Sequence, residues 1–307
     1  MKPAWTAGVT RARLLLNRAI GPGLASTVAA SPSLADGVAA LAGSAYGERV
    51  RAGEDLAAAQ RSVADTLLWH LRILAGWLPA GGGALVRALA GWFELANIDA
   101  RMAALASDGR EPPPFVLGTL ATAWRAVEPA HTIEELAGAV GAAWALPAAG
   151  SPAELAIGLR VAWARRVQDS APDAAEWVAG AGALLVAREL LVAHSHDHQA
   201  QLLLYPGIDE RVLAARTLAE LRSALAPRAR WSLATVSEPA ELWRAELGWW
   251  DRVQDDANAL LRHIDDEAAV LAAVALLAVD AQRTVRALQS AAQGGGYGLT
   301  EVSGGVG

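Results

Sequence analysis

The stretch Glu94–Ala126 reads ELANIDARMAALASDGREPPPFVLGTLATAWRA and predicts a connector of fixed length between two helices. Its first part continues a helix, because apolar residues recur at helical spacing at Ile98, Met102 and Leu105. A polar stop follows and ends at Gly109, which suits a left-handed cap. Pro112–Pro114 favour extended chain, and Gly118 permits a tight turn before a helix predicted from about Thr119.

A related pattern recurs twice further along the chain. Residues 188–225 again run from a helix through a polar break to a short apolar run with Pro206 and Gly207. A degenerate third copy begins near Asp280, where a helix runs into glycines. Copies at intervals of roughly ninety residues predict an internal repeat.

Composition excludes several classes of chemistry. The chain has 307 residues and a net charge of −6, whereas a general nucleic-acid binder is usually basic. It contains no cysteine, which rules out disulfides, cysteine-ligated zinc, iron–sulfur clusters and thiol catalysis. Its twelve tryptophans are interpreted as core residues that fill gaps between alanine-rich helices.

No segment has the pattern of a membrane span or a secretory signal. The apolar run Leu14–Leu16 is too short for a signal peptide, and Ala268–Val279 is too short to cross a bilayer. We expect a soluble protein, including one that rests against a membrane complex.

Helical periodicity organises the rest of the chain into three long hairpins. The predicted pairs are 54–78 with 84–106, 153–168 with 173–193, and 239–265 with 266–290. No stretch alternates as a β-strand does. The predicted fold is therefore all-α, with three pseudo-repeated helical units forming a funnel. The predicted segments are a lead-in at 1–50 and repeats at 51–145, 146–226 and 227–307.

The first hairpin is predicted from its apolar stripes. One stripe comprises Leu56, Val63, Leu67, His70, Leu74 and Trp77. The partner helix has two apolar faces, one through Leu85, Leu89, Trp92 and Ala96 and one through Leu95, Ile98, Met102 and Leu105. A helix with two apolar faces lies between neighbours, which predicts at least three packed helices.

The motif His194-Ser195-His196-Asp197-His198 is the strongest candidate for chemistry. On a helix, His194 and His198 would share a face, as in two-histidine zinc sites. No glutamate follows the first histidine, so the metalloprotease pattern fails. Consecutive Ser, His and Asp side chains point in different directions and cannot form a hydrolytic triad. We interpret the motif as a solvated polar helix end, with metal binding as the open alternative.

Acidic residues near the third hairpin suggest a second, weaker site. The groups Asp251, Asp255, Asp256 and Asp265, Asp266, Glu267 are similar to the acid-rich helices that hold magnesium and diphosphate in all-α prenyl-converting enzymes. Ala259 stands where a further carboxylate is needed, and the second group lies at a hairpin turn where Asp also caps a helix. A structural role is therefore preferred.

Two other motifs are interpreted as structural. Gly81–Gly83 lacks a following Lys-Ser/Thr and a preceding strand, so it predicts a hairpin turn rather than a phosphate loop. A basic cluster is interpreted as a solvated face, with contact to an acidic partner as the alternative; its members are Arg11, Arg13, Arg18, Arg49 and Arg51.

Taken in order, these motifs resemble the C/d subunits of V-type and A/V-type rotary ATPases. The resemblance is closest over residues 10–126 and 240–290. It rests on the lead-in with Arg11 and Arg13, on Tyr46-Gly47, and on the repeated unit; the family-motif positions are Tyr46, Glu94, Asn97, Arg101 and Gly118. Weaker occurrences are Arg188-Glu189-Leu190 and Asp280 with Arg283. This sequence departs from the family by having Asn in one copy only, and by having Ala and Trp in place of many aromatics.

The resemblance implies a non-catalytic subunit without cofactor or metal. Such a subunit is a funnel that couples the central axle of the soluble motor to the membrane proteolipid ring for ion transport. It would be cytoplasmic and peripherally bound to the membrane through that ring, with no nucleic acid or small-molecule substrate. The alternatives are a generic α-helical scaffold or assembly protein, and an all-α magnesium-dependent enzyme.

Overall fold

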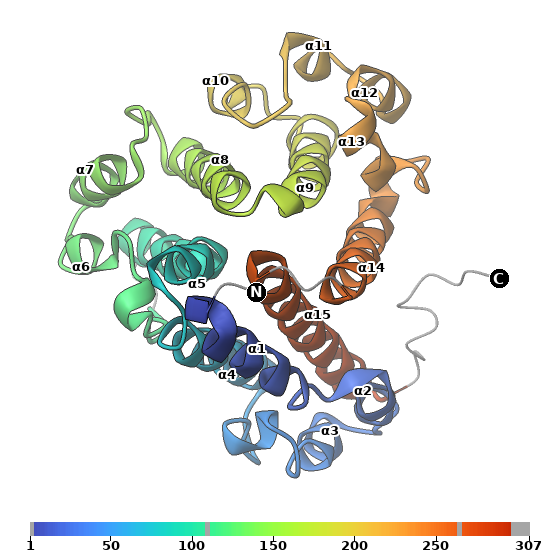
Figure 1. Cartoon of the computed structure of the whole chain (residues 1–307). Coiled ribbons are helices and arrows are strands. Elements are labelled where there is room, and N and C mark those ends of the chain that lie inside the picture. Colours follow the sequence, from blue (N-terminus) through green and yellow to red (C-terminus); the bar gives the residue numbers. More distant parts are fainter. Residues whose placement is uncertain (1–2, 108–110, 263–265, 296–307) are drawn as a thin grey trace. The chain divides into compact units, whose positions relative to one another are not determined.

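The protein is all-α, as predicted, and no strand occurs among the residues that the structure describes. A computed structural model describes residues 3–107, 111–262 and 266–295 (Figure 1). The chain divides into two compact units, Met1–Val86 with Trp250–Gly307, and Arg87–Trp249. It passes between them within α5 (Ala80–Ala106) and within α14 (Leu242–Leu261). The division into a lead-in and three repeats stays a prediction.

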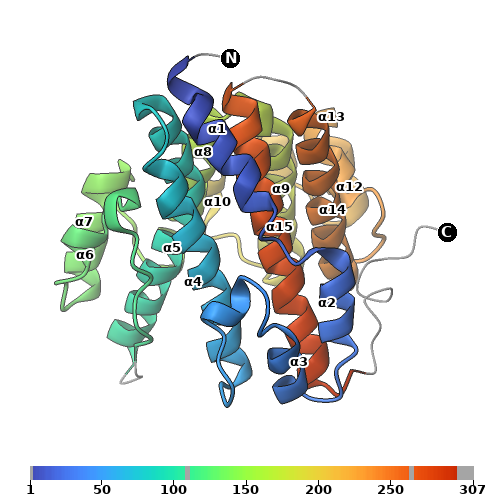
Figure 2. The same cartoon turned by 60° about the horizontal axis from the view of Figure 1, so that its bottom comes forward.

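The first unit is built around α15 (Asp266–Ala292). This helix packs against α1 (Thr6–Leu16), α2 (Gly21–Ala29), α3 (Leu34–Ala40) and α4 (Leu56–Ala75) (Figure 2). Two short 3-10 helices, η1 (Pro3–Trp5) and η2 (Tyr46–Glu48), complete it. Its core joins residues from both ends of the chain: Ala25, Val28, Ala29, Val38, Leu41, Tyr46, Val50, Ala59, Val63, Ala281, Ala287 and Leu288.

The second unit contains two long helices and a series of short ones. After the rest of α5 come η3 (Gly118–Leu120), α6 (Trp124–Val127) and α7 (Ile133–Trp144). The predicted second hairpin follows as α8 (Pro152–Ser170), η4 (Pro172–Ala174), α9 (Ala175–Ala187) and the π-helical η5 (Arg188–Val192). The remaining elements are α10 (Gln199–Leu202), α11 (Glu210–Leu213), α12 (Leu218–Ala224), α13 (Pro227–Arg230), η6 (Trp231–Leu233) and η7 (Pro239–Glu241).

Several helices begin where the sequence places a capping residue. The Ser33 side chain accepts from the Asp36 N–H at the start of α3, and Thr132 accepts from the Glu135 N–H at the start of α7. Each hydroxyl satisfies a backbone N–H that has no partner within its own helix. Both helices therefore begin directly after a capping residue.

The glycine-rich stretch Gly81–Gly83 was predicted wrongly. Gly81–Gly83 lies inside the first turn of α5 and is not a hairpin turn, because Ala80 already begins that helix. Gly21-Pro22-Gly23 opens α2, with proline in the first turn where it removes no helical hydrogen bond. The predicted cap at Gly109 and the turn at 263–265 lie outside the described residues.

The predicted apolar stripes of the first hairpin were wrong at two tryptophans, which were expected to be buried. Val63, His70 and Leu74 are buried as expected, but Trp77 is 55% exposed and Trp92 is 52% exposed. Trp92 instead packs against the Trp163 ring, with centroids 5.6 Å apart. Helical spacing identifies residues on one face, but it does not tell how far the neighbouring element extends over that face.

Helix α15 is long and apolar enough to cross a membrane, yet 72% of its most apolar window is buried inside the protein. The predicted helix over 266–290 is confirmed, and its apolar window extends beyond the uncharged run Ala268–Val279 that was judged too short to span a bilayer. The helix continues to Ala292 and carries the buried Asp280. Burial and a buried carboxylate are typical of a core helix.

Candidate functional site

The histidine motif does not lie on a helix. Residues 194–196 have no regular structure and follow η5, and His194 has a positive φ of 51°. The π turn closes with a hydrogen bond from the Ala193 N–H to the Arg188 carbonyl oxygen, 2.8 Å long. His194 and His198 therefore do not share a helical face, and the two-histidine zinc geometry does not form.

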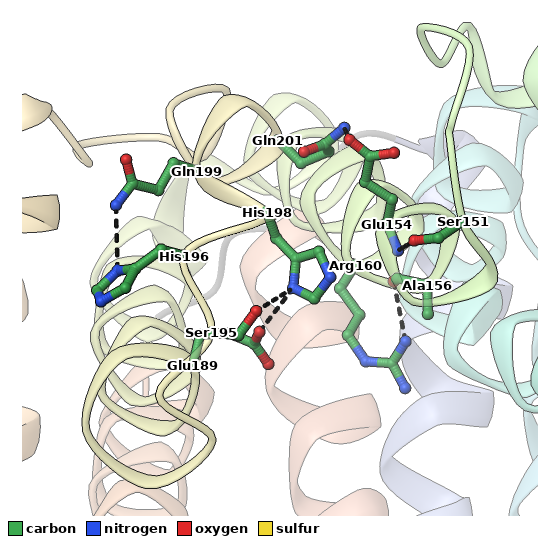
Figure 3. Close-up of polar contacts among 10 residues, drawn as sticks. All are labelled: Ser151, Glu154, Ala156, Arg160, Glu189, Ser195, His196, His198, Gln199 and Gln201. Carbon is green, nitrogen blue, oxygen red and sulfur yellow. Dashed lines mark hydrogen bonds and ion pairs between the residues drawn. The ribbon is translucent and has the colours of Figure 1, made fainter.

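Instead, His198 pairs with a carboxylate from the preceding helical turn. Its Nδ1 lies 2.8 Å from Oε2 of Glu189, and both side chains are largely buried (Figure 3). The neighbouring His196 contacts Gln199 at 3.3 Å and Arg216 at 3.0 Å. In the described part of the chain, no three His, Asp or Glu side chains are grouped to hold a metal ion.

Ser195 completes a group that resembles a hydrolytic triad without its geometry. Its Oγ lies 3.4 Å from His198 Nδ1, the same nitrogen that contacts Glu189 (Figure 3). In a triad the nucleophile and the carboxylate contact opposite ring nitrogens, so that the imidazole takes a proton from one side and is held from the other. Because both partners contact the same nitrogen, they fix the orientation of the imidazole ring but do not activate the serine.

Further polar contacts between helices lie near His198 and Glu189, and they were not predicted from the sequence. Gln201 Nε2 donates to Glu154 Oε1 at 2.8 Å, and Arg160 Nη2 lies 2.8 Å from Asp99 Oδ2 (Figure 3 shows the first pair). Hydrogen bonds from the Gly150 N–H and then from Gln201 lower the pKa of Glu154. These pairs join residues far apart in sequence, so no local pattern could have indicated them.

The acidic groups of the third hairpin are engaged within the protein. Asp256 accepts from Arg252 Nε at 2.8 Å, one turn away on α14. Burial raises the pKa of Asp251, which the nearby Arg286 opposes. Asp265 lies outside the described residues, and Asp266 begins α15. An arginine beside a carboxylate competes with a metal ion for its oxygens, which favours the structural interpretation.

Glu94 has the most demanding environment of the family-motif positions. Its side chain is fully buried, and Oε1 accepts from the backbone N–H groups of Thr122, Ala123 and Trp124 at 2.9, 2.6 and 2.7 Å. These groups form the N-terminus of α6. A carboxylate suits this position because unpaired N–H groups and the helix dipole both favour negative charge there.

The other positions of this copy fix the same connector. The Asn97 amide donates to the Phe115 carbonyl oxygen at 2.9 Å and accepts from the Phe115 N–H at 2.7 Å. Arg101 contacts Glu111 Oε2 and the Ala130 carbonyl oxygen, both at 2.6 Å. Gly118 has a φ of 60°, a conformation that favours glycine.

Tyr46 and Asp280 form the corresponding group in the first unit. The Tyr46 hydroxyl donates to Asp280 Oδ2 at 2.9 Å, and the carboxylate also accepts from the N–H groups of Ile20 and Gly21 at 3.0 and 2.9 Å. By analogy with the first copy, Asp280 would contact the connector that follows it. In the described chain its partners are instead residues of the N-terminal segment. A single acidic residue within an apolar helix needs polar partners when it is buried. From the sequence, the isolated Asp280 could therefore have indicated a buried polar contact.

These contacts show a common arrangement at three carboxylates, Glu94, Glu189 and Asp280. Each contacts the residue that precedes a short helix: Ala123 before α6, His198 before α10 and Ile20 before α2. None of these three residues caps its own helix through its side chain. Glu94 and Asp280 accept from backbone N–H groups at these helix starts, whereas Glu189 contacts the His198 imidazole instead.

Comparison of the sequence with known protein families and with curated proteins gave no match.

Proposed function

We propose that the chain is a non-catalytic subunit of a V-type rotary ATPase, a socket that couples the rotating axle to the membrane proteolipid ring. In this role it is cytoplasmic and reaches the membrane only through the ring. The proposal rests on the motif resemblance and on what the motif residues do in the fold.

The observation that carries the proposal is the repeated carboxylate arrangement. Glu94, Glu189 and Asp280 recur at intervals of roughly ninety residues, and each contacts the residue before a short helix, Glu94 and Asp280 through backbone N–H groups and Glu189 through the His198 side chain. A long helix, a connector and a short helix thus form one unit that is used repeatedly. This is the organisation that the resemblance implies for a pseudo-threefold socket.

An adaptor that transmits torque must resist deformation, and the described contacts supply stiffness. Buried, fully paired carboxylates such as Glu94 allow the connector one arrangement, because any other leaves a charge without partners. Close packing of helices transmits strain with little compression. The chemistry of these groups is thus used to hold backbone rather than to convert a substrate.

Co-purification tests the proposal directly. The protein is tagged in its native cells, membranes are solubilised gently, and captured proteins are identified by mass spectrometry. We expect axle subunits and ring proteolipid in near-stoichiometric amounts. A matched strain expressing the tag alone controls for non-specific capture.

Recovery of neither partner, from cells shown to contain the motor, would overturn the proposal in favour of a scaffold or assembly protein. The enzyme alternative has its own test, the double substitution Asp255→Ala with Asp256→Ala. It predicts loss of a magnesium-dependent activity, whereas an adaptor loses at most a little stability.

A further inference from the structure

His70 on α4 is buried, with 4% of its surface exposed. The charged residues near it come from three separate segments of the chain. Helix α4 packs against α1 and against η2 within the first unit (Figure 2). Arg11 comes from α1, Arg18 follows it, and Glu48 and Arg49 come from η2 and the residue after it. Burial first, and then the charges of Arg18, Arg11 and Arg49, lower the pKa of His70, while the charge of Glu48 raises it.

Two buried nitrogen atoms in this group have no hydrogen-bond partner among the described residues. They are Nε2 of His70 and Nε of Arg11. A buried donor without a partner costs about 1–3 kcal/mol, so such an atom normally has a partner in protein, in ordered water or in a bound ion. Both are nitrogen, and the Arg11 atom is a donor in every protonation state, which points to an acceptor as the missing partner.

The charged residues near His70 carry a net positive charge. Glu48 neutralises Arg18, with Oε1 2.5 Å from Nη2, while the structure shows no ion pair for Arg11 or Arg49 in the described chain. Asp65 lies within reach of the Arg49 charge but also faces Arg61, at 4.0 Å.

We propose that Arg11, Arg49 and His70 form a binding site for an anionic oxygen group, a phosphate or a carboxylate. Arginine donates to such groups in a planar, paired geometry, and a partly buried setting strengthens the contact. The anionic ligand could be supplied in two ways, as a free anion or as an acidic side chain of a partner protein. The site stands whether or not the chain belongs to a rotary motor.

Inorganic phosphate is the first probe, added to the full-length chain with ¹³C-labelled histidine. The His70 resonance is assigned from its absence in His70→Gln. We expect a saturable shift of that resonance and a rise in the pKa of His70 above about 4, since a bound anion favours the charged imidazole. Chloride at matched ionic strength controls for screening.

Substitutions identify the arginines that bind. Arg11→Gln and Arg49→Gln should each weaken phosphate binding at least about tenfold. Arg13→Gln on α1 and Arg72→Gln on α4 are matched controls, because neither arginine is among the charges that shift the pKa of His70, and they should change binding less than about twofold. Arg49 is exposed, so its variant keeps the test valid if Arg11→Gln does not fold.

A glutamate-rich peptide distinguishes the two sources. Binding of phosphate assigns the site to a free anion, and binding of the peptide without phosphate assigns it to a partner carboxylate. An unchanged His70 resonance with both probes overturns the site. So does binding that survives in the Arg49→Gln and Arg11→Gln variants.

Discussion

A carboxylate without exposure to water is stable only where its charge is compensated, and Glu94 shows how this chain achieves that. Three backbone N–H groups donate to it, and the charge of Arg166 acts with it from α8. The Arg166 guanidinium is itself held over the Trp144 ring at 3.9 Å and donates to the Ala143 carbonyl oxygen. One acid therefore joins α5, α6 and α8.

Glu94→Gln should destabilise the protein by about 2–4 kcal/mol, because the amide loses the charge and turns a donor toward donors. Urea unfolding followed by circular dichroism measures the change. Glu134→Gln is the control, since Glu134 is exposed in the first turn of α7, and it should change stability by less than about 0.5 kcal/mol. Equal effects of the two substitutions would contradict the role assigned to Glu94.

The buried His70 predicts a pH dependence of stability. Burial first, and then the charge of Arg18, lower its pKa from 6.5 to about 4. Between these values the unfolded chain binds more protons than the folded one, so stability is full above pH 6.5 and falls as the pH decreases toward 4.

His70→Leu should remove this contribution, so the variant should lose about 2–3 kcal/mol less than the natural protein between pH 7 and pH 4.5. Unfolding by urea at the two pH values measures the difference. Other titrating groups are common to both proteins and cancel in the comparison. An identical pH dependence of the two proteins would show that His70 titrates normally.

At the scale of elements, α9 shows why glycine occurs inside a helix that must pack closely. Glycine destabilises a helix interior by roughly 0.5–1 kcal/mol relative to alanine. A Cβ at Gly180 would come within 2.7 Å of the Trp231 ring, and one at Gly182 would collide with the Tyr205 ring. Tyr205 is held in place because its hydroxyl donates to the Val178 carbonyl oxygen at 2.8 Å.

Gly182→Ala should therefore destabilise the protein by about 1–3 kcal/mol, as expected for overpacking in a dense core. Gly138→Ala in α7 is the matched control: no atom lies within 4 Å of its added Cβ, and it should stabilise by about 0.5–1 kcal/mol. Thermal unfolding of the two variants measures both signs. Stabilisation by Gly182→Ala would show that Tyr205 moves aside without cost.

At the scale of the whole molecule, the first unit depends on both ends of the chain. Residues 1–50 supply α1, α2 and α3 against α15, and Tyr46, Ile20 and Gly21 supply the partners of Asp280. Without them, α15 would expose a long apolar face and an unpaired buried acid.

A chain of residues 51–307 should therefore lose cooperative unfolding of the first unit and bind a hydrophobic dye. Co-expression of residues 1–50 as a separate fragment should restore both properties to nearly those of the intact protein. Dye fluorescence and calorimetry measure the outcome. Cooperative unfolding of 51–307 alone at the melting temperature of the intact protein would contradict it.

The sequence alone determined the all-α class, the long helices and many of their starts. These follow from local interactions: apolar spacing along one helix, and caps such as Ser33 and Thr132 that bond within a few residues. The motif positions Glu94, Asn97 and Arg101 were also singled out from sequence, although their partners were not.

Only the tertiary structure decided which groups those residues contact. Asp280 contacts Ile20 and Gly21, which are distant in sequence, His198 pairs with Glu189, and Trp92 is exposed on a predicted apolar face. Each outcome depends on where distant segments pack. A side chain's partners at long range are set by the burial of whole elements, and no local pattern contains that information.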